Sequence, residues 1–167
     1  MVLRSVALSP LMLFITLGLA GRSMADFTCD AKYFLKHAST GAYYTINNAN
    51  GGGLQASGNH RGWFQQFTVC RDSSWSSQFF VLKSEAMSSQ TGQDRYVRQD
   101  SEYFYAIPGT LTGNHLFEWR GGGSDGYYAL VHAESGRYLT VNLADGHDWV
   151  YLGGKNFGWE QALYRED

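Results

Sequence analysis

Short stretches in which apolar and polar residues alternate recur along the chain, and Gly-rich or polar segments separate them. The clearest example covers residues 33–37, which are followed by the short segment 38–41 and a second alternating stretch at 42–46. Alternation on both sides of a segment that contains a glycine predicts a β-hairpin. We therefore expect strands rather than helices throughout the chain.

The hairpin pattern is written twice. Residues 33–47 read YFLKHASTGAYYTIN, and residues 128–142 read YALVHAESGRYLTVN. The segment GNHRGWFQQF at 58–67 likewise returns as GKNFGWEQAL at 154–163. The distance between the copies leaves room for a third, and a fixed repeat decides the architecture before any other signal. We expect three units, at about 30–75, 76–122 and 123–167.

Each complete copy also predicts a third and a fourth strand. The third lies near 54–56 and 149–152, and the fourth runs through 63–67 and 159–163. Trp63 and Trp159 keep the same spacing to the apolar residues four positions later, which favours a place in the core, although an exposed indole could instead stack on a sugar.

The middle unit is the least regular of the three. Apolar stretches at 80–84, 95–98, 103–106 and 115–119 predict its four strands. Residues 85–94 replace the short first turn of the other units. We expect a long polar turn there, which either reflects drift or carries function; surface loops tolerate such insertions.

The first 25 residues have the pattern of a secretory signal peptide. Arg4 precedes an apolar run over 6–20, and the small-residue site Ser23-Met24-Ala25 follows. A membrane anchor is the alternative, but the run is shorter than the roughly 20 residues that span a bilayer. We expect cleavage after Ala25, a secreted extracellular protein without stable membrane insertion, and one domain over 26–167.

Composition supports a strand-built core, and the net charge excludes some classes of binding partner. Aromatic residues make up 16% of the chain, which suits a strand-built core. Lys and Arg number 13 against 15 Asp and Glu, and the net charge is −2. A mildly acidic chain without a basic cluster argues against nucleic acid or an anionic membrane as partner.

The chain has two cysteines: Cys29 lies just before the first unit, and Cys70 lies just after the last strand expected in that unit. In an oxidising secretory route they are expected to form one disulfide rather than stay free thiols. Such a bond would contribute about 3–4 kcal/mol in the chain-entropy model.

The chain contains no zincin, phosphate-loop, nucleophile-elbow or dinucleotide motif, and no cysteine–histidine metal spacing. We therefore expect no enzyme, no catalytic residue, no metal and no cofactor. His37 and His132 share one repeat position at the end of a first strand, where they are expected to bond turn carbonyls.

Polar side chains on the loops before the fourth strands suit shallow recognition of a ligand, although they could also be ordinary solvated turns. The candidates there are Asn59, His60, Asn114, His115, Lys155 and Asn156. A second group, at the start of the third strand of the last unit, comprises His147, Asp148 and Trp149. Trp75 and Tyr103 are weaker candidates for exposed aromatic residues.

Three four-stranded units with Gly-x-Tyr and a closing Trp resemble the β-trefoil, an all-β fold of twelve strands. The segments LVHAESGRYL at 130–139 and WEQAL at 159–163 are similar to the fascin-like branch. The Lys36-His37 and Asn59-His60 regions resemble mytilectin-type lectins, but the His-Pro-x-Gly element is missing. The Gln-x-Trp of ricin-type lectins keeps its glutamine, at Gln65 and Gln161, and loses its tryptophan.

The resemblance and the signal peptide together imply a secreted β-trefoil binding module. The leading hypothesis is a lectin-like protein whose shallow polar loops bind an extracellular glycan or glycoprotein. The alternative is a non-lectin extracellular interaction protein, such as a receptor ligand or a structural or toxin-like fascin-type trefoil.

Overall fold

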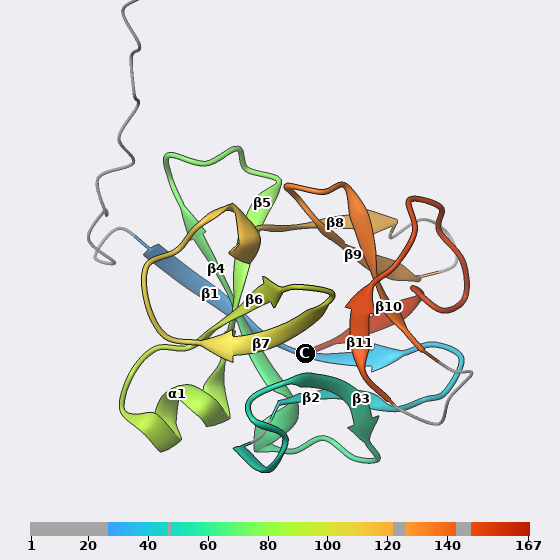
Figure 1. Cartoon of the computed structure of the whole chain (residues 1–167), viewed down its shortest axis with the longest axis horizontal. Helices are drawn as coiled ribbons and strands as arrows, with labels where there is room; N and C mark the ends of the chain where they lie inside the picture. Colours follow the sequence, from blue (N-terminus) through green and yellow to red (C-terminus); the bar gives the residue numbers. More distant parts are fainter. Residues whose placement is uncertain (1–26, 47, 122–125, 143–147) are drawn as a thin grey trace, which may run out of the picture.

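The computed structural model describes residues 27–46, 48–121, 126–142 and 148–167 (Figure 1). The expected signal peptide at 1–25 and the candidate His147 lie outside these ranges. Within them the chain is built of strands, as the alternating pattern predicts, together with one short α-helix and three 3-10 turns.

The strands follow one another in three groups of four. The first group is β1 (Phe27–His37), β2 (Tyr43–Ile46), β3 (Leu54–Gly58) and β4 (Gln66–Asp72). The second is β5 (Phe79–Ser84), β6 (Tyr96–Asp100), β7 (Tyr103–Ile107) and β8 (Phe117–Gly121). The third is β9 (Tyr128–His132), β10 (Arg137–Val141), β11 (Val150–Leu152) and β12 (Leu163–Glu166).

The first and fourth strands of the units close into a barrel. Antiparallel pairing runs from β1 to β4, β5, β8, β9 and β12, and β12 pairs with β1 again. The remaining strands form the hairpins β2–β3, β6–β7 and β10–β11. These hairpins meet through the bridges Gly53–Tyr105, Gln55–Trp149 and Tyr103–Tyr151, and Figure 1 shows them gathered around the centre of the view.

The core repeats with the units. Equivalent positions of the first, second and fourth strands are buried in every unit, and each buried side chain of this size contributes about 1.5–3 kcal/mol. These positions are Leu35, Leu82 and Leu130; Tyr44, Val97 and Leu139; and Phe67, Phe117 and Leu163. The duplicated segments of the sequence are therefore mainly the parts that fill the barrel.

The disulfide between Cys29 and Cys70 is present, which confirms that prediction. The two residues face each other across the β1–β4 pairing. The bond ties the beginning of the first unit to its last strand.

The fourth strands begin later than the sequence suggested. In the first unit the 3-10 turn η3 (Trp63–Gln65) precedes β4, and in the second unit η4 (Gly113–His115) precedes β8. A turn at 159–161 takes the same place in the third unit, and the side chains of Trp63 and Trp159 are 49% and 64% exposed. The expectation that both indoles lie in the core is wrong, because the spacing of four residues crosses a turn before it enters the strand.

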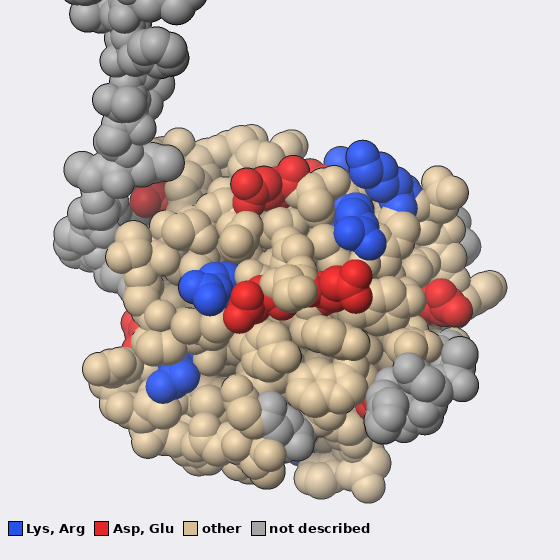
Figure 2. Space-filling view, viewed as in Figure 1, with Lys and Arg blue, Asp and Glu red and all other residues tan. Residues whose placement is uncertain are grey.

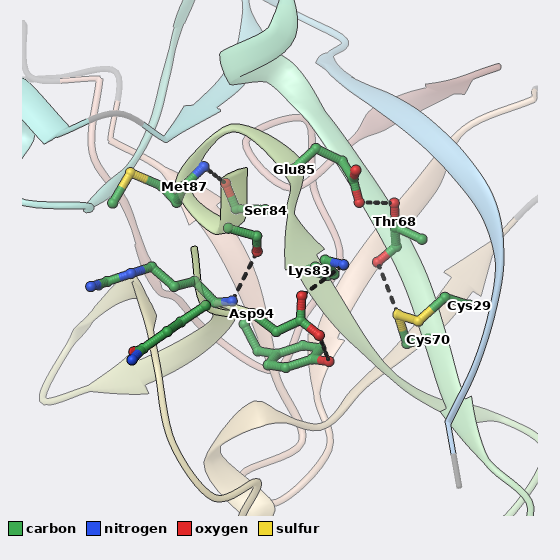
Figure 3. A network of polar contacts seen from close by, with 12 residues as sticks. Cys29, Thr68, Cys70, Lys83, Ser84, Glu85, Met87 and Asp94 are labelled. Carbon is green, nitrogen blue, oxygen red and sulfur yellow. Dashed lines mark hydrogen bonds and ion pairs between the residues drawn. A yellow bond between two sulfur atoms is a disulfide. The ribbon is translucent and has the colours of Figure 1, made fainter. Parts of the chain in front are cut away.

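The middle unit carries a helix where we expected a long polar turn. Residues Glu85–Thr91 form α1, which buries Ala86 and Met87. The Ser84 hydroxyl accepts a hydrogen bond from the Met87 amide and caps the first turn, and Gly92 ends the helix with φ +67°. Figure 3 shows the beginning of α1, with Ser84, Glu85 and Met87, together with the disulfide. The segment is therefore ordered structure.

Candidate functional site

The predicted loop residues of the first and third units lie on the surface. Asn59 and His60 are exposed in the loop before η3, and the two side chains bond each other. Lys155 and Asn156 are exposed in the equivalent loop before Trp159.

Asp148 and Trp149 lie at the hairpin cap instead. Asp148 is exposed, and its carbonyl accepts a hydrogen bond from the Ala56 amide. Trp149 is half-buried between Tyr103 and Tyr105, with ring centroids 5.9 and 6.4 Å away. Tyr103 is 41% exposed, so this ring is the more accessible of the cluster.

His115 is placed differently from His60. Its side chain is 2% exposed, and its Nδ1 accepts a hydrogen bond from the Thr112 amide. Burial, together with the nearby Arg98 guanidinium, lowers the pKa of His115 to about 4. In each of the three units, one backbone amide donates to the backbone carbonyl three residues earlier; these amides belong to Gln65, His115 and Gln161. His115 therefore takes the place of the repeated glutamine inside the protein and does not lie on a surface loop as the sequence suggested; Asn114 beside it is exposed.

Among the described residues, the two large apolar side chains with the highest exposed fractions lie in the third unit. Trp159 and Phe157 are 64% and 52% exposed, and the hollow that they line has a volume of about 250 Å³. Tyr127, Gly158 and Ala162 complete its lining. The Tyr127 ring stands at 84° to the Trp159 ring, with centroids 5.3 Å apart. The hollow therefore presents aromatic surface to solvent beside the predicted residues Lys155 and Asn156.

Hydrogen bonds to strand β10 hold the turn that carries Trp159 in place. The Gln161 side-chain amide donates to the Thr140 hydroxyl at 3.0 Å, and both side chains are buried. The Val141 amide donates to the Glu160 carbonyl at 3.0 Å. Such internal bonds hold an exposed side chain in place before a ligand arrives, which lowers the entropic cost of binding.

His37 contributes to the same support. Its ring is buried, Nδ1 lies 3.0 Å from the Thr40 hydroxyl, and Nε2 lies 3.3 Å from the Glu160 carbonyl. Burial lowers the pKa of His37, so the ring is neutral near pH 7. Its counterpart His132 meets the Ser135 hydroxyl in the same way. The expected bond to a turn carbonyl is thus present at His37, through Glu160, and each of the two rings also contacts a hydroxyl group of its own turn.

The other two units do not repeat this aromatic hollow. In the first unit, Lys32 and Arg61 stand where the third unit has Tyr127 and Phe157, and Arg61 pairs with Glu166 at 2.8 Å. In the second unit, Gly113 takes the place of the tryptophan, and the Glu134 carboxylate lies against it. The indole of Trp63 stands beside the Phe64 ring, with centroids 6.2 Å apart, whereas that of Trp159 packs against Tyr127 and lines the hollow together with Phe157.

The charged side chains are spread over the surface. On the face in Figure 2, basic and acidic groups alternate over a largely uncharged surface. Among the described residues, no group of three or more His, Cys, Asp or Glu side chains is placed to hold a metal ion. The same residues contain no helix that is long and apolar enough to cross a membrane.

Comparison with known proteins identifies the architecture. No protein-family model matches the chain, and no curated protein matches it. Among solved structures, the designed threefold-symmetric protein ThreeFoil superposes with a TM-score of 0.64 at 18% identity, over 83% of this chain and 99% of its own. The fold is a β-trefoil.

Two further trefoils of known structure hold saccharides. SeviL bound to the asialo-GM1 saccharide superposes with a TM-score of 0.60 at 14% identity, over 84% of this chain and 98% of its own. The ricin B-like lectin of Macrolepiota procera, in complex with lactose, superposes with a TM-score of 0.61 at 14% identity, over 83% of this chain and 96% of its own. Identities this low show the fold alone. The fascin-like branch receives no support from these three structures and stays a prediction.

Proposed function

We propose that this chain is a secreted carbohydrate-binding trefoil that takes a sugar ring in the hollow of Trp159 and Phe157. The observation that carries the proposal is the exposure of two large aromatic rings on an internally bonded turn. Single exposed apolar residues are ordinary, but a contiguous exposed aromatic surface with polar neighbours is typical of a ligand site. The two saccharide-bound trefoils agree with this class of ligand.

The chemistry of the hollow suits a sugar. The C–H face of a pyranose ring can lie against an indole, and aromatic contacts of this kind contribute about 0.5–1.5 kcal/mol beyond the area they bury. The Lys155 ammonium and the Asn156 amide, on the adjoining loop, provide donors and an acceptor for hydroxyl groups. With so few contacts in a shallow site, we expect a single sugar to bind with a Kd of about 1 mM, and an extended or multivalent glycan to bind more tightly.

A glycan array with the purified protein, followed by titration of each retained glycan, tests this function. For a glycan built of hexoses without acetamido groups, Trp159→Ala should weaken binding at least about tenfold, because it removes the larger ring of the hollow. Trp63→Ala is the matched control: it removes an indole from the equivalent turn but leaves the hollow intact, so the affinity should stay within about twofold. Both variants should keep the wild-type Tm, since both indoles are exposed.

The non-lectin alternative gives a different result. If no immobilised glycan is retained at millimolar sensitivity, the carbohydrate function is wrong, and an extracellular protein partner becomes the better hypothesis. Equal weakening by the two tryptophan variants would remove the hollow from the function. Loss of binding in Asn156→Ala with an unchanged Tm would place the predicted polar loop in the site.

A further inference from the structure

A second hollow lies where the first two units meet. The 3-10 turn η2 (Asn48–Asn50), the turn η3 and the helix α1 surround it, and its volume is about 560 Å³. It is lined by Asn48, Ala49, Phe64 and Gln90. These residues come from three elements, and none of them lines the hollow of Trp159.

Two side-chain amides form the polar wall of this hollow. The side-chain amide nitrogen of Asn48, Nδ2, donates to the side-chain oxygen Oε1 of Gln90 at 2.8 Å. Within the described part of the chain, the structure gives both side chains only this bond, so the Asn48 oxygen still accepts and the Gln90 nitrogen still donates. Exchanging oxygen and nitrogen in both amides also leaves one donor beside one acceptor. The pair therefore presents the two complementary functions of an amide group next to each other.

The helix that carries Gln90 is anchored at several points. Ser84 caps its first turn, the Thr68 hydroxyl donates to the Glu85 carboxylate, and the Ser88 hydroxyl accepts from the Arg95 amide (Figure 3). The Lys83 ammonium pairs with Asp94 at 2.8 Å beyond the helix end. Gln90 therefore stands on a supported element, and its position relative to Asn48 is defined before a ligand binds.

We propose that this second hollow binds the acetamido group of an N-acetylhexosamine. The acetamido N–H donates to one side-chain amide, its carbonyl accepts from the other, and its methyl group lies toward the Phe64 ring, which is partly exposed. A sugar that carries only hydroxyl groups lacks both the amide pair and the methyl group. The inference rests on the proposed carbohydrate function, which it extends to a sugar class and a separate site.

The repeat explains why this site occurs once. Phe64 corresponds to Glu160 in the third unit, and in the described ranges an α-helix occurs only in the middle unit, where α1 packs against η3. The third unit instead has the four-residue turn at 133–136. The insertion at 85–94 thereby supplies a side chain that the other units cannot offer.

Titration of the purified protein with N-acetylglucosamine and N-acetylgalactosamine, each against its parent hexose, tests the proposal by saturation-transfer NMR. We expect the acetamido sugars to bind at least about tenfold more tightly, with the strongest transfer at the methyl group. Gln90→Ala and Asn48→Ala should each abolish the difference. Gln93→Ala is the matched control: it removes an exposed amide beyond the helix, outside the hollow, and should leave the difference intact.

The outcomes separate the two sites. If Trp159→Ala leaves the preference for acetamido sugars unchanged while Gln90→Ala removes it, the second site stands, whatever the first hollow binds. Equal affinity for acetamido and parent sugars, or an unchanged preference in Gln90→Ala, overturns the second site without touching the first. Tighter binding of Nε-acetyl-lysine amide than of either sugar would also overturn it, because the acetamido group would then come from a peptide.

Discussion

A buried glutamine–threonine pair is repeated in the first and third units. The Gln65 amide donates to the Thr45 hydroxyl at 3.0 Å, and Gln161 donates to Thr140 at the same distance. A glycine lies against each threonine: a Cβ added at Gly153 would approach the Thr140 side chain closer than 3.0 Å. Close packing against the threonine therefore favours glycine at both places, Gly58 and Gly153.

Gly153→Ala should therefore destabilise the protein by about 1–3 kcal/mol, the usual cost of overpacking a buried site. Gly154→Ala should cost less, because a Cβ there meets only the Asn156 amide nitrogen, at 3.9 Å. Urea unfolding of both variants measures the difference. Equal destabilisation would show that the threonine contact does not limit this position.

The replacement of the glutamine by His115 in the middle unit makes stability depend on pH. The ordinary pKa of 6.5 applies in the unfolded chain, and burial lowers it to about 4 in the folded one. The unfolded state therefore binds the additional proton, and stability falls as the pH is lowered from about 6.5 to about 4. The loss from this one group is on the order of 3 kcal/mol.

His115→Gln, which installs the residue of the other two units, should remove this contribution. We expect the free energy of unfolding to fall less between pH 7.5 and pH 4.5 in the variant than in the wild type, as measured by urea unfolding. His37 and His132 remain in both proteins and act as internal controls, since burial lowers the pKa of each. Identical pH profiles would contradict the assignment to His115.

At the scale of elements, the middle-unit helix has the most local support. Ser84→Ala removes the hydroxyl that caps α1 and should cost about 1 kcal/mol. Ser89→Ala, on the exposed side of the same helix, is the control and should stay within about 0.5 kcal/mol. Thermal unfolding should thus show a lower Tm for Ser84→Ala alone. A Tm equal to that of Ser89→Ala would mean that the cap does not stabilise the helix.

The strands could be predicted from the sequence, but the elements between them could not. Alternation and the turn glycines gave the hairpins, because side chains of a strand alternate between core and solvent. A seven-residue helix leaves too short a periodic pattern to be recognised. The turns η3 and η4 are shorter still, and they decide that Trp63 is exposed and His115 is buried.

The site was predicted only in part for the same reason. Lys155 and Asn156 stand out as polar residues on a repeated loop, and the structure places them on the surface. The sequence does not reveal the aromatic hollow beside them. Tyr127 immediately precedes β9 and is far from Trp159 along the chain, and the repeated spacing of Trp159 favours a place in the core. Only the three-dimensional arrangement joins Tyr127 and Trp159.

At the scale of the whole molecule, each unit is bonded to another one. The Ala38 amide donates to the Ala162 carbonyl, and at the equivalent place the Ala133 amide donates to the Leu116 carbonyl. Between the first two units, contacts of α1 with η3 and β4 take this role. Each unit is thus completed by contacts with a neighbour.

The Cys29–Cys70 bond restrains this assembly at the first unit. Replacing both cysteines by alanine should lower the free energy of unfolding by about 3–4 kcal/mol, since the bond joins residues 41 positions apart. Reductant should lower the wild-type Tm and leave that of the double variant unchanged. A thiol titration of the denatured protein that gives the same result with and without reductant would refute the bond.

The pairing of β1 with β12 brings the two ends of the described chain into neighbouring strands. Glu166 pairs with Phe34, and Asp167 is the next residue along the chain. The other end, Phe27 at the start of β1, is seven residues before Phe34. At about 3.4 Å per residue, a flexible linker of roughly ten residues could join the ends. The chain could then be opened at another loop between units, such as that between β4 and β5, to give a circular permutant with the same barrel and a different order of synthesis.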